Sequence, residues 1–592
     1  MKAIVLAAGV GGRMRPLTEN VHKSLLPIGD TTIFGRILDG LLDIRIDEIT
    51  VVTGHLSEQI HHFVSERYPD APIRFLHNQR YRDTNNIVSL AMALEQMRLD
   101  SDIILIECDV LFDPALLRRL TTPERGNIAL VDRYRPGMDG TVVSVEGGII
   151  TQVFPPHLQT EDFDYRDKFK TVNIYRFDRD FCRAKLQPLL KCYADVIDSR
   201  CYYELVLGML INMQRERVRA EVVDGGLWSE VDDPNDLAAA RFLFEPQMRS
   251  KILEEAAGGH WNFPILDFSF MRNMYFPTDA MLAAMRRGLP VLAQSYGSRQ
   301  QVLDRKLALV LRCEAERVIC LNGATQAFPL LPHIFGRQRA LLPKPTFGEF
   351  SRWFPDHDCY ADAPGIEREQ LEGRANDYGV VVLVNPNNPT GTVLSTEWLH
   401  HMMARHPQTT FLVDESFVAF SNEKPLLTRL ERAPLSNVLI IGSLSKCFGV
   451  PGLRLGYTYS SNADLLNAFR AEIPIWNLGA MAEFFLELWL KFQPEYLDSL
   501  SKTALDRCQF AKRLSALEQV QKVYAGGGNF LLLRLKGEDA SPAKNLLDTL
   551  LQENSMYVKD VSAKFPEPAP WIRVAVRRAA ENLRLVDAMA TL

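Results

Sequence analysis

The chain has 592 residues, of which 24% are charged, and a formal net charge of −6 at pH 7. This length predicts more than one domain with its own core, and the modest charge gives no sign of binding to nucleic acid or to a membrane surface. No apolar run approaches the roughly 18 residues of a membrane span, and the 9 Cys include no C-x-x-C pair that would indicate a zinc site. We therefore expect a cytoplasmic protein without membrane insertion.

The first predicted element is a buried strand. The apolar run KAIVLAAG at residues 2–9 is typical of a parallel strand whose two faces are both covered. In the glycine-rich turn that follows, Gly11 and Gly12 allow close backbone approach, and Arg13 and Lys23 add positive charge. Such a turn after a strand binds phosphates through its backbone N–H groups.

Strand and helix patterns then alternate along the chain. They run through EITVVTG, LSEQIHHFVSERY, IRFLHN, NNIVSLAMALEQM and DIILIECDV. This alternation predicts a doubly wound α/β sheet.

These segments, together with EVDDPNDL, resemble the sugar-nucleotide-type nucleotidyltransferases, and more closely the phosphocholine cytidylyltransferases, over residues 1–243. The resemblance implies a Rossmann-like domain that uses CTP, with Mg²⁺ held by Asp109 and Asp232. It also implies that Arg13 and Lys23 neutralise the departing pyrophosphate. The nucleotide-binding residues that it implies are Leu6, Ala7, Ala8, Gly9, Gly11, Arg13, Lys23, Asn85, Ser89 and Asp109.

The chemistry of such a reaction is consistent with these residue types. A phosphate or phosphonate has its second pKa near 6, so at pH 7 it is already a nucleophile and needs no general base. It needs cations that screen charge while its oxygen attacks the α-phosphorus of a nucleoside triphosphate. A Mg²⁺ ion held by one or two carboxylates would suit Asp109 and Asp232.

The acceptor pocket is predicted from Tyr202, Tyr203 and Glu204, which fall about where the choline enzymes place an aromatic and acidic pocket. A quaternary ammonium favours an aromatic cage, whereas a primary ammonium favours carboxylate acceptors. After Tyr134, where the choline enzymes carry a tryptophan, the segment RPGMDGTVV contains no aromatic residue. We therefore expect a primary amine, with Tyr202 and Glu204 as substrate residues; a position of Glu204 on a solvated helix face stays open.

A helical linker is predicted for residues 244–257, where apolar residues recur at helical spacing and a Gly pair follows. The second domain is predicted to span residues 258–592. Its most informative stretch is SLSKCFGVPGLRLGY, in which Lys446 lies between an apolar strand and a glycine-rich turn. An amine near phosphate-binding groups suits a carbonyl cofactor such as pyridoxal 5'-phosphate.

With NPNNPTG and FLVDESF, this stretch resembles the fold-type I pyridoxal-phosphate enzymes of the class I/II aminotransferase family. The resemblance implies a large α/β domain and a small α+β domain. It implies Lys446 as the Schiff-base lysine, Asp414 on the pyridinium nitrogen, and Asn388 on the phenolic oxygen of the cofactor. The other cofactor-binding residues that it implies are Gly323, Ala324, Thr325, Ser443, Ser445 and Arg454 around the phosphate, Phe347 stacked on the ring, and Tyr296 reaching the neighbouring subunit's site in a homodimer. Arg573 falls at the carboxylate-binding arginine of the family.

The second domain is most similar to threonine-phosphate decarboxylases and then to histidinol-phosphate aminotransferases, and the whole chain resembles fusions of a phosphonate cytidylyltransferase with a 2-aminoethylphosphonate transaminase. We expect transamination of phosphonoacetaldehyde by an amino donor, followed by CTP-dependent cytidylylation of the 2-aminoethylphosphonate and release of pyrophosphate. The alternative is decarboxylation of L-phosphoserine, followed by synthesis of CDP-ethanolamine. Both reactions would use Lys446, Asp414 and Asn388, so the residues leave this choice open.

Overall fold

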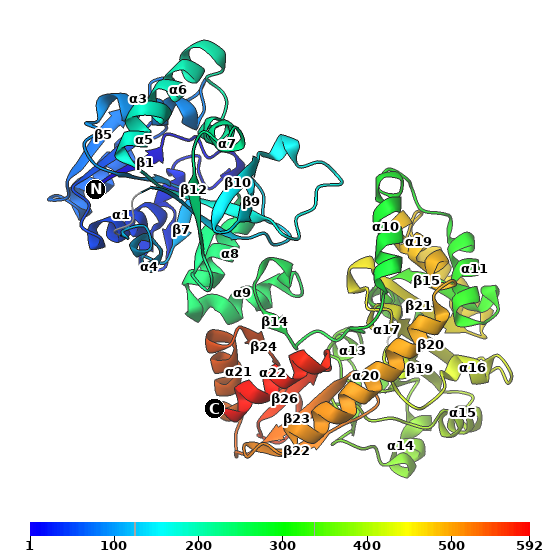
Figure 1. The fold of residues 1–592 in the computed structure, drawn as a ribbon. Coiled ribbons are helices and arrows are strands. Elements are labelled where there is room, and N and C mark those ends of the chain that lie inside the picture. The colour runs from blue at the N-terminus through cyan, green and yellow to red at the C-terminus, as the bar shows by residue number, and fades with distance from the viewer. Residues whose placement is uncertain (123–125, 337) are drawn as a thin grey trace. The chain divides into compact units, whose positions relative to one another are not determined.

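The computed structural model describes residues 1–122, 126–336 and 338–592, and the chain folds into two units, Met1–Pro264 and Ile265–Leu592 (Figure 1). The segment 244–257, which the sequence predicts to be a helical linker, includes α9 (Arg249–Ala256) and lies inside the first unit.

Unit 1 is built on a nine-stranded sheet with the strand order β5-β4-β1-β6-β11-β8-β12-β10-β9. The strands are β1 (Lys2–Ala7), β4 (Glu48–Thr53), β5 (Ile73–His77), β6 (Ile103–Glu107), β8 (Asn127–Arg133), β9 (Val142–Glu146), β10 (Ile149–Phe154), β11 (Phe169–Phe177) and β12 (Val218–Val222). The first four in this order are parallel, as the alternating pattern predicts. Beyond β6 the sheet becomes mixed, because β11 runs antiparallel to both β6 and β8.

Helices cover both faces of this sheet. They are α1 (Ile33–Asp43), α2 (Ser57–Arg67), α3 (Asn86–Gln96), α4 (Ala115–Arg118), α5 (Arg179–Phe181), α6 (Gln187–Cys192), α7 (Tyr203–Asn212) and α8 (Pro234–Phe244). Alternation along β1 divides the core between the two faces. Val5 belongs to the cluster with α1 and α2, whereas Ile4 and Leu6 belong to the cluster with α3 and α7.

Unit 2 holds a seven-stranded sheet with the order β15-β21-β20-β19-β18-β16-β17. The strands are β15 (Val318–Asn322), β16 (Ala340–Lys344), β17 (His357–Ala361), β18 (Val380–Val384), β19 (Thr410–Asp414), β20 (Val438–Ser443) and β21 (Leu455–Ser460). β21 is antiparallel to both of its neighbours, while β20 to β17 are parallel. The carboxyl ends of β18, β19 and β20 therefore meet at one edge, which is where α/β proteins bind their ligands.

A smaller four-stranded sheet in unit 2 has the order β22-β23-β26-β25. Its strands are β22 (Val520–Tyr524), β23 (Phe530–Leu535), β25 (Lys559–Asp560) and β26 (Trp571–Ala575). The helices of unit 2 are α10 (Asp279–Leu292), α11 (Gln300–Leu311), α12 (Leu331–Phe335), α13 (Glu349–Trp353), α14 (Arg368–Arg374), α15 (Thr396–Arg405), α16 (Leu426–Leu430), α17 (Leu444–Cys447), α18 (Ala463–Glu472), α19 (Ala480–Trp489), α20 (Gln493–Leu514), α21 (Ser541–Glu553) and α22 (Ala579–Ala590).

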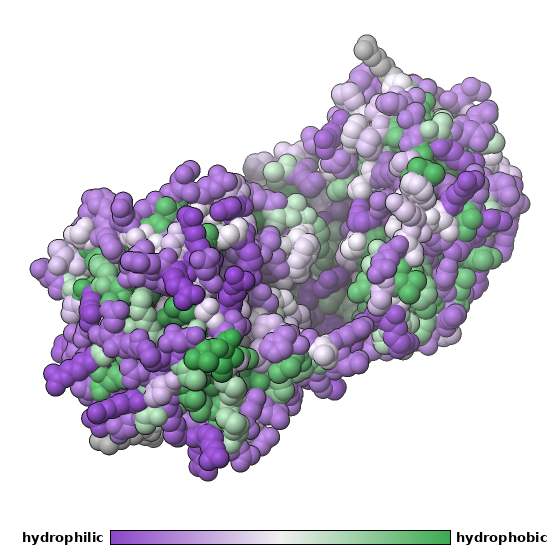
Figure 2. All heavy atoms as spheres, turned by 90° about the horizontal axis from the view of Figure 1, so that it is seen from above, coloured by the Kyte–Doolittle hydropathy of each residue, from purple (hydrophilic) through white to green (hydrophobic). Residues whose placement is uncertain are grey.

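The surface seen in Figure 2 is mostly hydrophilic, with hydrophobic residues in scattered patches. Across residues 1–122, 126–336 and 338–592, no helix combines the length and the apolar character that crossing a bilayer requires.

Candidate active sites

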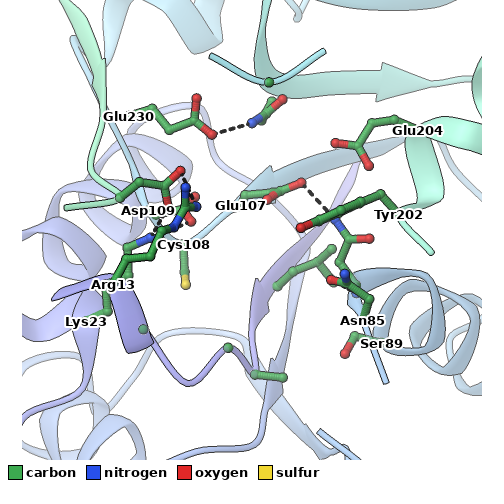
Figure 3. A pocket seen from close by; sticks show the side chains of 18 of the residues that line it. Arg13, Lys23, Asn85, Ser89, Glu107, Cys108, Asp109, Tyr202, Glu204 and Glu230 are labelled. Carbon is green, nitrogen blue, oxygen red and sulfur yellow. Dashed lines mark hydrogen bonds and ion pairs between the residues drawn. The ribbon is translucent and has the colours of Figure 1, made fainter. Parts of the chain in front are cut away.

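A cavity of about 720 Å³ lies in unit 1, where the loops after β1 and β6 meet (Figure 3). The predicted residues that line it are Leu6, Ala8, Gly9, Gly11, Arg13, Lys23, Asn85, Ser89, Asp109, Tyr202, Glu204 and Asp232. Ala7 does not line the cavity, because its side chain is fully buried in the core beneath the sheet. The cavity wall thus joins segments from both ends of the predicted nucleotidyltransferase domain.

Lys23 occupies the centre of an ion-pair cluster in this cavity. Its Nζ donates to Asp109 Oδ2 at 2.9 Å and to Asp232 Oδ1 at 2.7 Å. An Nη of Arg13 lies 2.7 Å from the other oxygen of Asp232. Asp232 reaches this point because β7 (Val110–Phe112) pairs with β13 (Trp228–Glu230) and so aligns the residues that flank the two strands. The two carboxylates therefore lie close enough to share one cation.

Charge pairing controls the ionisation of this cluster. Burial lowers the pKa of Lys23, but Asp109 and Asp232 outweigh it, and the net pKa lies above the ordinary value. Burial likewise raises the pKa of Asp232, while Lys23 and Arg13 lower it, and the net shift is downward. Asp232 is therefore a carboxylate at neutral pH.

The pair fits a Mg²⁺ ion that is also held by substrate. Mg²⁺ commonly binds through one or two carboxylates and completes its shell with phosphate oxygens and water. Asp109 Oδ1 is buried without a hydrogen-bond partner, so it is available to a cation. Within the described part of the chain, no group of three or more His, Cys, Asp or Glu is placed to hold a metal by itself.

The glycine turn shapes the phosphate side of the cavity. Gly11 has φ +63°, and a Cβ there would lie 3.2 Å from the Cβ of Lys23. A side chain at this position would be strained and would press on the lysine. On the far wall, Asn85 caps α3 through its own side chain, and Ser89 accepts a hydrogen bond from Asn78 at 3.1 Å.

Besides Asp109, Asp232 and Asp139, three further carboxylates line the cavity, of which the sequence predicted only Glu204. Asn173 Nδ2 donates to Glu230 Oε1 at 3.0 Å, and Lys170 Nζ lies 3.0 Å from Glu230 Oε2. Burial raises the pKa of Glu230 to about 7, although Lys170 opposes the shift. Glu107 is the third, at the end of β6. An acidic residue that ends an otherwise apolar strand is the signal in DIILIECDV that could have identified it.

In unit 2, the predicted cofactor residues gather at the carboxyl edge of the seven-stranded sheet. Asp414 ends β19, and Lys446 lies in α17, directly after β20. Burial lowers the pKa of Lys446 to about 8, with Arg573 and Arg454 acting in the same direction and Asp414 opposing them. Lys446 therefore interacts electrostatically with all three groups, and its ammonium loses a proton more easily than that of an ordinary lysine.

Two of the predicted phosphate-binding residues, Thr325 and Gly323, lie beside Arg454. Its guanidinium donates to Thr325 Oγ1 at 3.0 Å. A Cβ at Gly323, where φ is +76°, would lie 2.4 Å from the same guanidinium, so only glycine fits. Ala324 lies in the following turn, and Ser445 Oγ donates to the carbonyl of Leu455 at 3.2 Å. A guanidinium beside the backbone N–H groups of a glycine turn is the donor set that the phosphate of pyridoxal phosphate would need.

Asn388 and Arg573 are joined directly. Arg573 Nη1 donates to Asn388 Oδ1 at 2.7 Å, and its other Nη donates to the carbonyl of Ser269. Arg573 is on β26, so a residue of the small sheet contacts the loop that follows β18 of the large sheet. Ser443 N donates to Ser416 Oγ at 3.0 Å, and Ser416 N donates to Asp414 Oδ1 at 2.9 Å. This chain of bonds links Ser443 to the buried carboxylate.

Two predicted residues stand apart from these contacts. The ring of Phe347 is 36% exposed and lies 6.0 Å from that of Phe328. Tyr296 is 79% exposed and stacks on Trp476 with ring centroids 4.5 Å apart. A residue that the sequence did not predict, Lys564, donates to the carbonyl of Thr346, next to Phe347, at 2.8 Å.

The two folds and their sites define an enzyme that combines a nucleotidyltransferase domain with a fold-type I, pyridoxal-phosphate-dependent domain. Residues 265–589 match the family model of aminotransferase class I and II, and residues 3–169 match that of the MobA-like NTP transferase domain. The first match spans more than half of the chain, which therefore belongs to the aminotransferase class I and II family.

Relatives support both assignments. CMP-5'-(3-aminopropyl)phosphonate synthase of Streptomyces rubellomurinus is 30% identical over an alignment that covers 100% of this chain and 95% of that protein. L-serine phosphate decarboxylase of Sulfurospirillum multivorans is 30% identical over 50% of this chain and 79% of its own length. Among solved structures, a decarboxylase from Sulfurospirillum multivorans is 28% identical with a TM-score of 0.50, and covers 57% of this chain and 99% of that one.

Proposed function

We propose that unit 1 transfers CMP from CTP to a phosphonate oxygen of a small aminoalkylphosphonate and releases pyrophosphate. The observation that carries this proposal is the composition of one cavity, which joins the Lys23, Asp109 and Asp232 cluster to an acidic wall that includes Glu204. The name of the full-length relative, which specifies a CMP-linked aminopropylphosphonate, supports the same substrate class.

The residues of unit 1 supply charge and position. A phosphonate dianion attacks without a general base. Lys23 and Arg13 stabilise the negative charge of the departing pyrophosphate, and the backbone of the loop around Gly9 and Gly11 contacts the triphosphate. When it is bound by Asp109 and Asp232, Mg²⁺ supplies further neutralisation of the triphosphate.

The excess of carboxylates over cationic side chains along the cavity supports an acceptor that carries a positive charge. Six carboxylates line the cavity, namely Glu107, Asp109, Asp139, Glu204, Glu230 and Asp232, against three cationic side chains, Arg13, Lys23 and Lys170. The lining includes the phenol rings of Tyr81 and Tyr202 but, within the described chain, no tryptophan or phenylalanine. A primary ammonium, which needs oxygen acceptors, suits this wall better than a quaternary one, which needs an aromatic cage.

We propose that unit 2 makes the amine that unit 1 uses, with pyridoxal phosphate bound by Lys446, Asp414, Asn388 and Arg454. The cofactor supplies an electron sink for cleavage of a bond at the α-carbon. Arg573 would hold the carboxylate of an amino-acid substrate, and Lys446 would move the proton at that carbon. Two reactions fit these residues: transamination of phosphonoacetaldehyde, and decarboxylation of an amino acid that carries a phosphonate or phosphate. The decarboxylase names among the relatives favour the second.

One experiment separates these reactions. The full-length protein with pyridoxal phosphate is incubated with phosphoserine or 2-amino-4-phosphonobutyrate, and separately with phosphonoacetaldehyde plus alanine or glutamate, and products are followed by phosphorus NMR. Release of carbon dioxide in the first set establishes decarboxylation, and formation of 2-aminoethylphosphonate only in the second establishes transamination. Pyrophosphate release from CTP with 2-aminoethylphosphonate or 3-aminopropylphosphonate tests unit 1, and a preference for phosphocholine would contradict the assignment of the acceptor.

We also propose that the chain acts as a homodimer, in which Tyr296 reaches the cofactor site of the neighbouring subunit. Support comes from the exposure of Tyr296 and Trp476, which are 79% and 51% exposed although both are large aromatic residues. Sedimentation of the full-length protein tests this, and a monomer that retains full activity in unit 2 would refute it.

A further inference from the structure

The acidic wall of the unit 1 cavity contains two carboxylates from different elements that face the same space. Glu107 ends β6, and Glu204 lies in the first turn of α7; both project into the cavity in Figure 3. Between them, Asn86 Nδ2 donates to Glu107 Oε1 at 3.3 Å, and Asn86 Oδ1 accepts from the backbone N–H of Tyr203 at 3.0 Å. Asn86 thus fixes the end of β6 against the start of α7.

Glu204 has an unmet hydrogen-bonding requirement. The residue is only 8% exposed, it lines the cavity, and its Oε2 is buried without a hydrogen-bond partner. A buried carboxylate oxygen without a partner is costly, so native proteins seldom retain one unless a ligand meets it. This oxygen therefore marks a binding position for a donor that comes from outside the chain.

The charge around the pair calls for a cation. Asp109 and Glu230 line the same cavity as Glu107 and Glu204, so four carboxylates share this space. Burial raises the pKa of Glu204, although Lys170 opposes the shift. Lys170 itself is paired with Glu230 at 3.0 Å. Among the described residues, neither Glu107 nor Glu204 makes an ion pair.

We propose that Glu107 is a specificity-determining residue of the acceptor site, where with Glu204 it binds the primary ammonium of a small aminoalkylphosphonate. This inference rests on the proposed function of unit 1. A primary ammonium has three N–H donors, which two carboxylates from different elements of this wall can accept as charge-assisted hydrogen bonds. A trimethylated ammonium has no donor and leaves Glu204 Oε2 unsatisfied.

The test compares 2-aminoethylphosphonate with ethylphosphonate, which lacks the ammonium, as acceptors for the full-length protein with CTP and Mg²⁺. The readout is the ratio of the two kcat/KM values, measured by pyrophosphate release. In Glu107→Gln this ratio falls by about 10- to 100-fold, as loss of a charge-assisted hydrogen bond predicts. The matched control is Glu221→Gln, a partly exposed glutamate on β12 outside the cavity, which leaves the ratio unchanged.

Three outcomes would contradict the assignment of Glu107 or the proposed function of unit 1. An unchanged ratio in Glu107→Gln, or an equal fall for both acceptors, overturns the assignment and leaves Glu107 a structural role. Equal use of the N,N,N-trimethyl analogue and 2-aminoethylphosphonate by the wild type overturns it as well. If neither phosphonate releases pyrophosphate with the wild type, the proposed function of unit 1 fails instead.

Discussion

Lys23 offers the most direct test of unit 1, because we assign it two roles. It neutralises Asp109 and Asp232 in the folded protein, and it neutralises the pyrophosphate during the reaction, and one substitution tests both. Its ammonium neutralises Asp109 and Asp232, and the side chains of the three residues are only 10%, 19% and 17% exposed, respectively. Removing one partner of a buried ion pair typically destabilises a protein by 3 to 5 kcal/mol. Since Arg13 still neutralises part of Asp232, we expect Lys23→Met to lower the stability of unit 1 by about 3 kcal/mol, near the lower end of that range.

This loss can be measured within unit 1 alone. Amide hydrogen exchange in peptides from β1 and β6 reports the stability of the nine-stranded sheet. Mg²⁺ without nucleotide should protect these peptides more in Lys23→Met than in the wild type, because the ion then binds two carboxylates from which a competing ammonium has been removed. CMP transfer should nevertheless fall by about 10²- to 10³-fold, since the pyrophosphate loses its cation.

A surface ion pair in the same unit provides the control. Lys185 lies 2.8 Å from Glu216 and is 44% exposed, so Lys185→Met should cost about 1 kcal/mol or less and leave the response to Mg²⁺ unchanged. If Lys23→Met exchanges like the wild type and Mg²⁺ protects both proteins equally, Asp109 and Asp232 do not form a shared cation site. The metal assignment would then be wrong.

Further predictions concern unit 2. Lys446→Ala should remove the visible absorbance of bound pyridoxal phosphate and leave CMP transfer intact; loss of both activities would contradict two independent sites. The free amine of Lys446 increases as pH rises through its lowered pKa of about 8, so uptake of the cofactor by cofactor-free protein should accelerate with pH around a midpoint near 8, and a midpoint near 10.5 would refute the burial argument. Gly323→Ala should weaken cofactor retention in equilibrium dialysis, because the new Cβ would lie 2.4 Å from the Arg454 guanidinium at a positive φ. Gly373→Ala, whose Cβ meets no atom within 4 Å, should retain cofactor like the wild type.

The parts of the fold that the sequence predicts are those with local signals. Lys446, Asp414 and Asn388 each follow an apolar run, so their positions at strand ends can be inferred from nearby residues. The first four parallel strands of unit 1 follow in the same way. The antiparallel β11 between β6 and β8 has no such signal, because its place in the sheet depends on pairings with strands distant in the chain.

Site residues that depend on long-range contacts were the hardest to predict. Lys23 contacts Asp232 across 209 positions, and only the resemblance to known nucleotidyltransferases pointed to that pair. Glu107 was missed because an acidic residue at a strand end is also an ordinary turn residue. What distinguishes it is the proximity of Glu204 from α7, which appears only in three dimensions.

The hydrogen bond between Arg573 and Asn388 couples the small sheet of unit 2 to its large sheet. Arg573 belongs to the small sheet, and Asn388 belongs to the loop at the edge of the large one. A carboxylate that engages this guanidinium competes with the amide oxygen for the same N–H group. If Arg573 binds a substrate carboxylate, as we propose, that binding would weaken the hydrogen bond to Asn388 and so alter the loop after β18 without any movement of the backbone.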